Sequence, residues 1–391
     1  MVTRHWDENI FNEIDCIRPT SKQHEDIEEN DQGKIIRVPY NPNFRDKILL
    51  RFGLTKYKYL RKIITLLYLI SRFISFKIDN TSNIFFAADK YILHNKCDYI
   101  LATGEPFILF RYAHILSKKH KIKWFADYRD GWSTNLAIKA LPLYKTFIYK
   151  FLNKYFEKRY CSDAEFLITV SEFAKNELSK IFWNKIVHLC PNGFFEEDFE
   201  DISTVSCAKD KFIISYIGNL YSYQPLELFL DSVREFISDN NLKNVNIIFY
   251  GVKYYNEQEN RVLKFSPALN DFISTTQRLP KNILFKELKK SHLLLLLASD
   301  KVDGSCAKVY EYLPLDRKIL LIKNDKGVLE KIITDCNAGT ACSSKQEIKD
   351  VLRTTYDEFI MTGEVKQQTK NIEKYSRKEG ASLLSNLILS N

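Results

Sequence analysis

The chain has 391 residues, of which 45% are hydrophobic and 14% aromatic, and its formal net charge at pH 7 is +9. This length predicts about two domains, and no apolar run approaches the ~18 residues of a membrane span. The eight cysteines include no Cys-x-x-Cys pair, which argues against zinc and dithiol chemistry and indicates reduced thiols in a cytosolic protein. A basic chain can attract nucleic acid, an anionic membrane or phosphorylated substrates, but no helix-turn-helix, RNP or zinc-finger pattern supports nucleic acid.

The N-terminal part has an unusual composition. Residues 7–34 are polar and acidic and predict a mobile loop, whereas residues 35–38 predict a short strand. A predicted helix over residues 51–77 carries apolar side chains among Lys and Arg. Such a helix either lies on an anionic membrane surface or packs on its domain with a basic outer face, and both interpretations stay open.

From residue 99 onward, short apolar strands alternate with helices. In the first half the predicted strands are 99–103, 122–126, 166–170 and 186–189, and the predicted helices are 107–118, 143–161 and 172–179. After a polar stretch at 196–210 the predicted strands are 212–217, 245–250, 273–278, 292–298 and 318–322, with helices at 225–238, 283–289, from about 308, and at 375–389. This alternation predicts a parallel sheet flanked by helices in each half.

Charged residues stand at the carboxyl end of the predicted strand 122–126. They are Asp127, Arg129 and Asp130, with Trp132 close behind. Loops in this position often carry function, so the two carboxylates can hold sugar hydroxyls or a proton while Arg129 faces phosphate. The alternative is an internal Arg–Asp salt bridge that only fixes the loop.

A second candidate site follows the predicted strand 292–298. Its loop contains Asp303, Gly304 and Ser305, and the helix that comes next carries Lys308 and Glu311 on one face. A helix N-terminus after a strand suits a phosphate, Lys308 adds a full charge, and the two carboxylates can accept hydrogen bonds from ribose or sugar hydroxyls. The alternative is a Lys308–Glu311 pair on a solvated helix face.

Two glycines stand at possible turns or ligand contacts, and several common nucleotide-binding motifs are absent from the sequence. Gly218 ends the first strand of the second half, where a glycine either lets the backbone approach a ligand closely or makes a turn. Asn192-Gly193 predicts a structural turn where the halves join. The sequence contains no Gly-x-Gly-x-x-Gly, Walker or Asp-x-Asp motif, and the last absence argues against a metal–diphosphate site on paired aspartates.

Five short motifs together resemble a bacterial subgroup of glycosyltransferase family 4, whose signature D-x-R-D-P-W is similar to the first of them. They are Asp127-Tyr128-Arg129-Asp130-Gly131-Trp132, Thr169-Val170-Ser171-Glu172, Pro191-Asn192-Gly193-Phe194, Tyr216-Ile217-Gly218-Asn219-Leu220-Tyr221 and Lys308-Val309-Tyr310-Glu311-Tyr312-Leu313. The resemblance covers nearly the whole chain, and its specificity lies in the order and spacing of the motifs.

This resemblance implies an α/β chain with the GT-B fold, in which two Rossmann-like domains with parallel sheets face each other across a cleft. The expected parts are an acceptor-side domain over residues 1–203, a nucleotide-sugar-binding domain over 204–370, and a helix over 371–391 that crosses back to the first domain. Because Thr3-Arg4-His5-Trp6 is similar to the end of the family's second strand, the first strand and its glycine-rich loop are expected to be absent.

The implied activity is a retaining transfer, of hexosyl type, from a nucleotide-sugar donor to a glycan or lipid-linked acceptor in cell-surface polysaccharide synthesis. No metal and no other cofactor is expected, nor any nucleic-acid partner. The implied location is the cytoplasm, with contact to the anionic inner face of the membrane. Two alternatives stay open: a truncated, non-catalytic nucleotide-sugar-binding or scaffold protein, and a GT-B nucleotide-sugar epimerase.

The resemblance also assigns roles to residues. The family's E-x7-E motif falls on Asp303 and Glu311, with Asp in the first position, which touches the donor sugar. Glu311 would bind the ribose, and Asp127 would lie near the donor sugar. Lys308 would bind the diphosphate together with the helix N-terminus that Gly304 and Ser305 precede.

One departure concerns the diphosphate. After the position of Gly218 the family carries an Arg and a Lys, but here Asn219 is followed by Leu220-Tyr221-Ser222-Tyr223, without either charge. Arg278, Lys253 or Lys308 is expected to substitute. Leu279-Pro280 would lie near the base.

Overall fold

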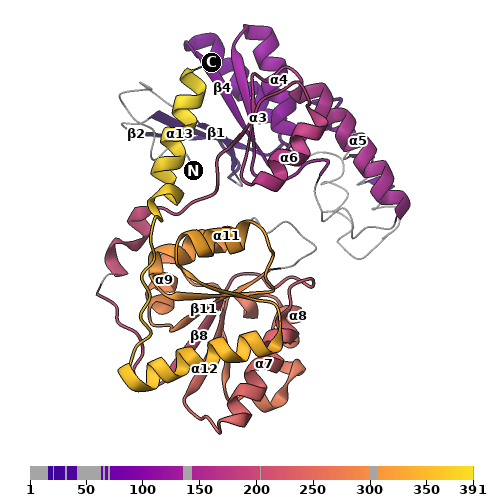
Figure 1. The fold of residues 1–391 in the computed structure, drawn as a ribbon. Helices are drawn as coiled ribbons and strands as arrows, with labels where there is room; N and C mark the ends of the chain where they lie inside the picture. Colours follow the sequence, from indigo (N-terminus) through magenta and orange to yellow (C-terminus); the bar gives the residue numbers. More distant parts are fainter. Residues whose placement is uncertain are drawn as a thin grey trace. The chain divides into compact units, whose positions relative to one another are not determined.

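The computed structural model describes residues 16–20, 22–30, 33–41, 63–64, 67–68, 71–134, 143–202, 204–298 and 306–390. They fall into two compact units, one of residues 1–191 with 381–391 and one of residues 192–380 (Figure 1). Within the described ranges, every helix is too short or too polar to pass through a bilayer.

The second unit is built on a six-stranded sheet in which all neighbours are parallel, in the order β10-β9-β8-β11-β12-β13. The strands are β8 (Phe212–Ile217), β9 (Val245–Tyr250), β10 (Ile273–Thr275), β11 (Leu293–Leu297), β12 (Lys318–Ile322) and β13 (Gly339–Cys342). The helices are α7 (Leu226–Asp239), α8 (Asn256–Phe265), α9 (Lys281–Lys289), α10 (Ala307–Tyr312), α11 (Val328–Asp335) and α12 (Lys345–Thr362), with short 3-10 helices at Glu196–Ile202, Val252–Tyr254, Pro267–Leu269, Leu313–Leu315 and Glu373–Tyr375.

The five leucines of β11 show why this sheet is covered on both faces. Leu293, Leu295 and Leu297 belong to the core that includes residues of α7 and α12. Leu294 and Leu296 belong to the opposite core, which includes residues of α9, α10 and α11. Because successive side chains of a strand point to opposite faces, an uninterrupted apolar strand requires helices on both sides.

The first unit has a four-stranded parallel sheet in the order β4-β5-β6-β7. Its strands are β4 (Tyr99–Gly104), β5 (Lys123–Tyr128), β6 (Leu167–Thr169) and β7 (Val187–Leu189), and its helices are α3 (Ser82–His94), α4 (Ile108–His120), α5 (Leu143–Cys161) and α6 (Glu172–Ile181). The last helix, α13 (Arg377–Leu389), returns to this unit, where Leu384 and Ile388 pack against Phe125 and Phe166.

The predicted strands and helices after residue 99 are confirmed, with ends that differ by a few residues. Ser171 caps the start of α6, because the backbone N–H of Ala174 donates to Ser171 Oγ over 3.1 Å. The turn predicted at Asn192-Gly193 is wrong. Phe194 instead forms a parallel bridge with Ser376, in extended backbone.

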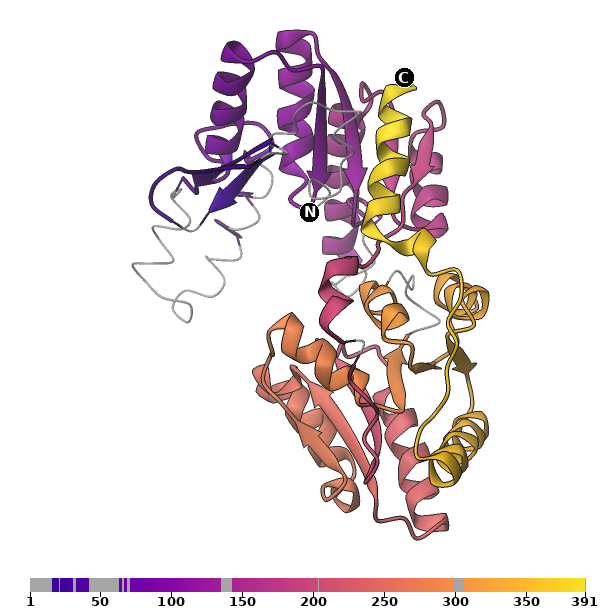
Figure 2. The ribbon, with the colours of Figure 1, turned by 90° about the vertical axis from the view of Figure 1, so that its left-hand side faces the viewer.

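The loop predicted for residues 7–34 is wrong where the chain is described. β1 (Cys16–Thr20), β2 (Asp26–Asn30) and β3 (Gly33–Pro39) form a separate sheet in the order β1-β3-β2, and β3 contains the strand predicted at 35–38 (Figure 2). Polar composition concealed β2, which is stabilised by cross-strand ion pairs: Arg37 of β3 bonds Asp26 and Glu28.

The basic helix predicted over 51–77 lies mostly outside the described residues. Those described up to Ser71 are helical, and turn residues 72–78 follow, so the helix ends earlier than predicted. Residues 2–6 also lie outside the described ranges.

We expect Gly193→Ala to destabilise the second unit. A Cβ at Gly193 would overlap the carbonyl oxygen of Tyr375, and Arg377 Nε donates to the carbonyl of Gly193 over 2.9 Å, so neither segment can move away freely. The free energy of unfolding should fall by about 1–3 kcal/mol, the usual cost of overpacking, in urea denaturation followed by circular dichroism. In the control Gly327→Ala, the nearest atom to the added Cβ would be Oδ2 of the Asp325 side chain, at 3.2 Å, so the overlap is much smaller. Equal losses in the two variants would contradict the steric argument.

Candidate functional site

The topology of the second sheet singles out the edge between β8 and β11. From β8 the chain proceeds to β9 and β10 on one side, and from β11 to β12 and β13 on the other. In open sheets of this order, ligands bind outside the carboxyl ends of the strands where the direction reverses. Gly218 follows β8, and Lys308 lies on α10 after β11. The two are close, because a Cβ added to Gly218 would lie 3.3 Å from Lys308 Cε.

Glycines keep side chains away from this edge. Gly218 and Gly251, which follow β8 and β9, have φ angles of +77° and +84°, a region that favours glycine. A Cβ added to Gly251 would lie 3.8 Å from Gly218 Cα and 3.6 Å from Arg278 Cγ. The two backbones therefore form a floor that a ligand can approach closely, with a cation on either side.

Lys308 is one of those cations, and it is largely buried. Its Nζ donates to Tyr216 OH over 2.6 Å and to the carbonyl of Asn219 over 3.2 Å, and it lies 4.0 Å from the ring centre of Tyr216. Burial lowers the pKa of Lys308 to about 8. Within the described residues no hydrogen bond or ion pair joins Lys308 to Glu311, so the amine is directed at the loop after β8.

Arg278 is the second cation at this loop. Its Nη2 donates to Asn219 Oδ1 over 3.2 Å, and its guanidinium carbon lies 4.3 Å from the ring centre of Tyr254 and 5.6 Å from that of Tyr255. Asn219 therefore bonds Lys308 through its backbone carbonyl and Arg278 through its side chain. Two cations from segments that are distant in the sequence thus contact the loop after β8, which has no charged residue of its own.

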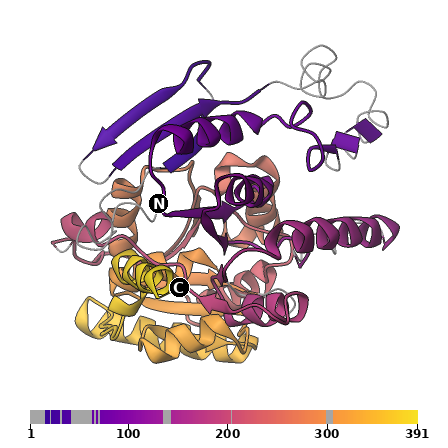
Figure 3. The same ribbon diagram turned by 90° about the horizontal axis from the view of Figure 1, so that it is seen from above.

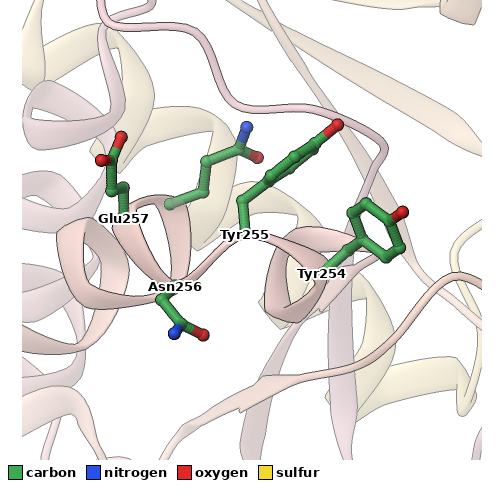
Figure 4. A pocket seen from close by; sticks show the side chains of 5 residues that line it. Tyr254, Tyr255, Asn256 and Glu257 are labelled. Carbon is green, nitrogen blue, oxygen red and sulfur yellow. The ribbon is translucent and has the colours of Figure 1, made fainter. Parts of the chain in front are cut away.

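A cavity of about 460 Å³ opens beside Arg278, lined by Tyr254, Tyr255, Asn256, Glu257 and Gln258. Figure 4 shows the side chains of Tyr255 and Glu257 on one side of the backbone and that of Asn256 on the other. The side-chain carbonyl of Gln258 accepts a hydrogen bond of 2.9 Å from the backbone N–H of Leu220. The cavity wall is thereby tied to the loop after β8. Neither tyrosine was a sequence candidate, although both follow a glycine at a strand's carboxyl end.

Glu311 lies one turn after Lys308 on α10. Lys281 Nζ lies 3.8 Å from Glu311 Oε1 and 3.2 Å from Asp198 Oδ2. Burial raises the pKa of Glu311, and the nearby Lys281 opposes that shift. Leu279, which precedes α9, packs against the core beneath. Asp303, Gly304 and Ser305 lie outside the described residues.

In the first unit, Asp127 and Arg129 form an ion pair at the carboxyl end of β5. Arg129 Nε donates to Asp127 Oδ2 over 2.8 Å, and Thr103 Oγ1 donates to the same oxygen over 3.2 Å. Burial would lower the pKa of Arg129, but the Asp127 carboxylate raises it overall. Among the described residues, Asp127 Oδ1 and Arg129 Nη1 are buried without a hydrogen-bond partner. The pair thus contains the salt bridge of the structural alternative and, in addition, two polar atoms that can serve a ligand.

The other two residues of this motif lie apart from the pair. Asp130 is exposed. Trp132 is buried and stacks on Phe107 with 5.1 Å between ring centres, so it belongs to the core.

A buried carboxyl group in the first unit was not a candidate at all. Glu157 of α5 is fully buried; its Oε2 accepts from the backbone N–H of Ser133 over 3.3 Å, and its Oε1 has no partner among the described residues. Burial raises its pKa to about 7. The helical period offered a signal, because Glu157 and the buried Cys161 are four residues apart and share a face.

No protein-family model matches the sequence, and no curated protein matches it. Solved structures do match. The sucrose-phosphate synthase from Thermosynechococcus elongatus has a TM-score of 0.60 at 11% identity, over 96% of this chain and 88% of its own. An α,α-trehalose-phosphate synthase (UDP-forming) from Burkholderia vietnamiensis has a TM-score of 0.56 at 10% identity, over 95% and 90%. Anabaena HepE in complex with UDP and glucose has a TM-score of 0.56 at 11% identity, over 91% and 86%.

At such identity the likeness shows the fold alone. The predicted fold class is confirmed: the chain is an α/β protein of GT-B type, with a parallel sheet in each of two units. In the described part of the chain, no group of three or more His, Cys, Asp or Glu is arranged to hold a metal ion.

We expect Glu157 to make the stability of the first unit fall between about pH 4.5 and 7. Folded Glu157 keeps its proton up to about pH 7, whereas the unfolded chain loses it near 4.5. Within that window the folded state binds more protons, so rising pH removes roughly 3 kcal/mol of unfolding free energy in total. Glu157→Gln lacks this titration. The free energy of unfolding of the wild type, measured by urea denaturation, should therefore fall relative to that of the variant as pH rises across the window.

Buried His292 also makes the free energy of unfolding depend on pH, in the wild type and in the variant alike. Burial lowers its pKa to about 4, so the second unit gains stability as pH rises from there to about 6.5. This opposite trend is common to both proteins and cancels in the difference. Parallel curves for wild type and Glu157→Gln would contradict the assignment.

Proposed function

We propose that this chain is a retaining glycosyltransferase of the family 4 type that transfers a hexosyl group from a nucleotide-sugar donor to a glycan or lipid-linked acceptor. Its proposed setting is cell-surface polysaccharide synthesis in the cytoplasm, in contact with the inner membrane. The observation that carries the proposal is the meeting of Lys308 and Arg278 at the glycine-lined loop of Gly218 and Asn219. The fold it shares with UDP-forming synthases supports it.

In this proposal the two cations hold the donor diphosphate. The glycine floor lets phosphate oxygens come close to backbone, and Lys308 and Arg278 supply two positive charges. These charges stabilise the nucleoside diphosphate as it leaves and the sugar becomes cation-like, which is electrostatic catalysis. Glu311 would accept hydrogen bonds from the ribose hydroxyls, and Leu279 would lie beside the base.

The first unit carries a second polar site of its own, which we assign to sugar hydroxyls. The free Oδ1 of Asp127 can accept a hydrogen bond from a hydroxyl, while Arg129 holds the other oxygen. We assign Asp303 to the donor sugar and Asp130 to the exposed side of the same loop as Arg129. The charge on the diphosphate is neutralised by side chains in this scheme.

Turnover separates this proposal from its alternatives. A non-catalytic binding or scaffold protein would bind nucleotide-sugar without releasing nucleotide. An epimerase would convert the sugar with no acceptor present. A transferase releases nucleoside diphosphate in an acceptor-dependent reaction, which is measured by coupled detection of the released nucleotide.

We expect one of UDP, GDP, ADP and CMP to raise the melting temperature of the purified chain. Binding to the folded state alone adds roughly 2.7 kcal/mol at a hundredfold excess over Kd. Lys308→Met and Arg278→Met should each weaken Kd at least about tenfold, because each removes a charge-assisted hydrogen bond worth about 1.5–3 kcal/mol. Lys264→Met is the control, since Lys264 is an exposed residue of α8. A cooperatively melting protein that responds to none of the four nucleotides would refute the donor site.

The affinity for that nucleotide should fall as pH rises above about 8. Burial lowers the pKa of Lys308 to about 8 in the free protein, so at higher pH the neutral amine must first take up a proton to bind the diphosphate. Kd should therefore increase up to about tenfold per pH unit. Lys308→Arg stays charged and should flatten the profile between pH 7 and 9 in calorimetric titrations. Identical pH profiles for the two proteins would exclude Lys308 from the diphosphate.

A further inference from the structure

Helix α5 carries large aromatic side chains that the protein leaves uncovered. Phe147, Phe151 and Tyr155 are 74%, 67% and 50% exposed. They are spaced four residues apart, so they follow one another along a single face of the helix. Figures 1 and 3 show α5 extending beyond the other helices of the first unit. Folded soluble proteins rarely expose neighbouring rings in this way unless the surface binds a partner.

Lysines occupy the same side of the helix. Lys150, Lys154 and Lys158 are all exposed, and at 100° per residue each lies within a quarter turn of the aromatic row. No ion pair to these three lysines occurs among the described residues. The only acidic residue of α5 is Glu157, which is buried. We call these six residues the aromatic–lysine face: Phe147, Lys150, Phe151, Lys154, Tyr155 and Lys158.

The inner side of α5 prevents this face from turning inward. Phe156 stacks on Phe73 with 5.0 Å between ring centres, and Tyr160 OH donates to the carbonyl of Phe73 over 2.6 Å. Cys161 is fully buried. Because these contacts hold the helix in one rotation about its axis, the exposed rings cannot be buried by rolling it.

We infer that the aromatic–lysine face is a docking surface for an anionic phospholipid bilayer. A helix that lies in a membrane interface inserts rings below the headgroups and directs long cationic side chains up to the phosphates. This face has both features, and its exposed charge is of one sign. A partner protein would have to supply an acidic patch matched to three lysines, whereas a leaflet of anionic lipid offers phosphates at every position.

The inference deepens the membrane contact in the proposed function and rests on it for the identity of the leaflet. The docking surface itself stands on α5 alone. With α5 flat on a membrane, a lipid-linked acceptor would diffuse in the plane to which the first unit is bound.

The test is flotation of the full chain with large unilamellar vesicles. Vesicles of phosphatidylcholine and phosphatidylglycerol in equal parts should carry the protein, and pure phosphatidylcholine vesicles should carry much less. Binding should weaken as salt rises from 0.05 to 0.5 M, because screening shortens the reach of the lysine charges. Each lysine near an anionic surface contributes about a fivefold factor in partitioning.

Two variants separate the two components. Phe147→Ser/Phe151→Ser/Tyr155→Ser and Lys150→Glu/Lys154→Glu/Lys158→Glu should each lower partitioning at least about tenfold. The charge control is Lys243→Glu/Lys264→Glu/Lys331→Glu, which changes the net charge equally at exposed lysines of the second unit. The apolar control is Ile360→Ser/Met361→Ser, whose side chains are 58% and 77% exposed. Both controls should bind vesicles as the wild type does.

Two outcomes would overturn the inference. One is wild-type protein that melts cooperatively and stays unbound at low salt. The other is equal vesicle binding by the α5 variants. Binding of a single-stranded oligonucleotide that depends on the α5 lysines, without vesicle binding, would assign the face to nucleic acid instead. Nucleotide-induced thermal shifts, measured on the same samples, report the donor site separately, so either proposal can fail alone.

Discussion

The second unit is organised around an ammonium group that has been taken out of water. Lys308 Nζ bonds a tyrosine hydroxyl and a backbone carbonyl, both of which are neutral. Desolvation penalises the charged form, which is why the pKa of Lys308 falls to about 8. A buried charge without a counter-ion destabilises a fold, so the surroundings must be held in place by other means. β8, β11 and the loop after β8 provide this support through a core of uninterrupted apolar strands. An incoming anion would recover the desolvation cost.

Three buried ionisable groups show three different solutions to the same problem. Asp127 is compensated by Arg129 two residues later. Glu157 is compensated by its own proton, because burial raises its pKa to about 7. Lys308 has only neutral hydrogen-bond partners among the described residues. In the first two arrangements the charge is compensated within the folded chain, although one oxygen of each carboxyl group has no hydrogen-bond partner among the described residues. The third becomes balanced only when a negative group arrives, which is the physical reason for placing the donor there rather than at Glu157.

The sequence contains enough to predict the layers but not the meeting of distant residues. Uninterrupted apolar runs such as β11 predict strands buried on both faces, and α5 was predicted with its observed ends. β2 was missed because its polar side chains show no apolar alternation, whereas its backbone pairing with β3 and the Asp26–Arg37 ion pair depend on strand register. The site was predicted in parts: Gly218 and Lys308 follow neighbouring strands at the switch point. The sequence named Arg278 only as one of three possible substitutes for the missing charges, since Arg278 and its partner Asn219 are 59 positions apart in the chain. Its stacking on Tyr254 depends on how the segments after β9 and β10 are packed.

Two features of this protein go against the usual rules of burial, and they do so in opposite ways. Lys308 is a cation placed inside, and Phe147, Phe151 and Tyr155 are rings placed outside. Leaving a large apolar side chain in water forgoes about 1.5–3 kcal/mol, so neither arrangement is favoured by folding alone. Each becomes favourable with a partner that carries phosphate: a nucleoside diphosphate in the first case and lipid headgroups in the second. The net charge of +9 then has a physical interpretation, because part of it lies where an anionic ligand and an anionic surface would meet the chain.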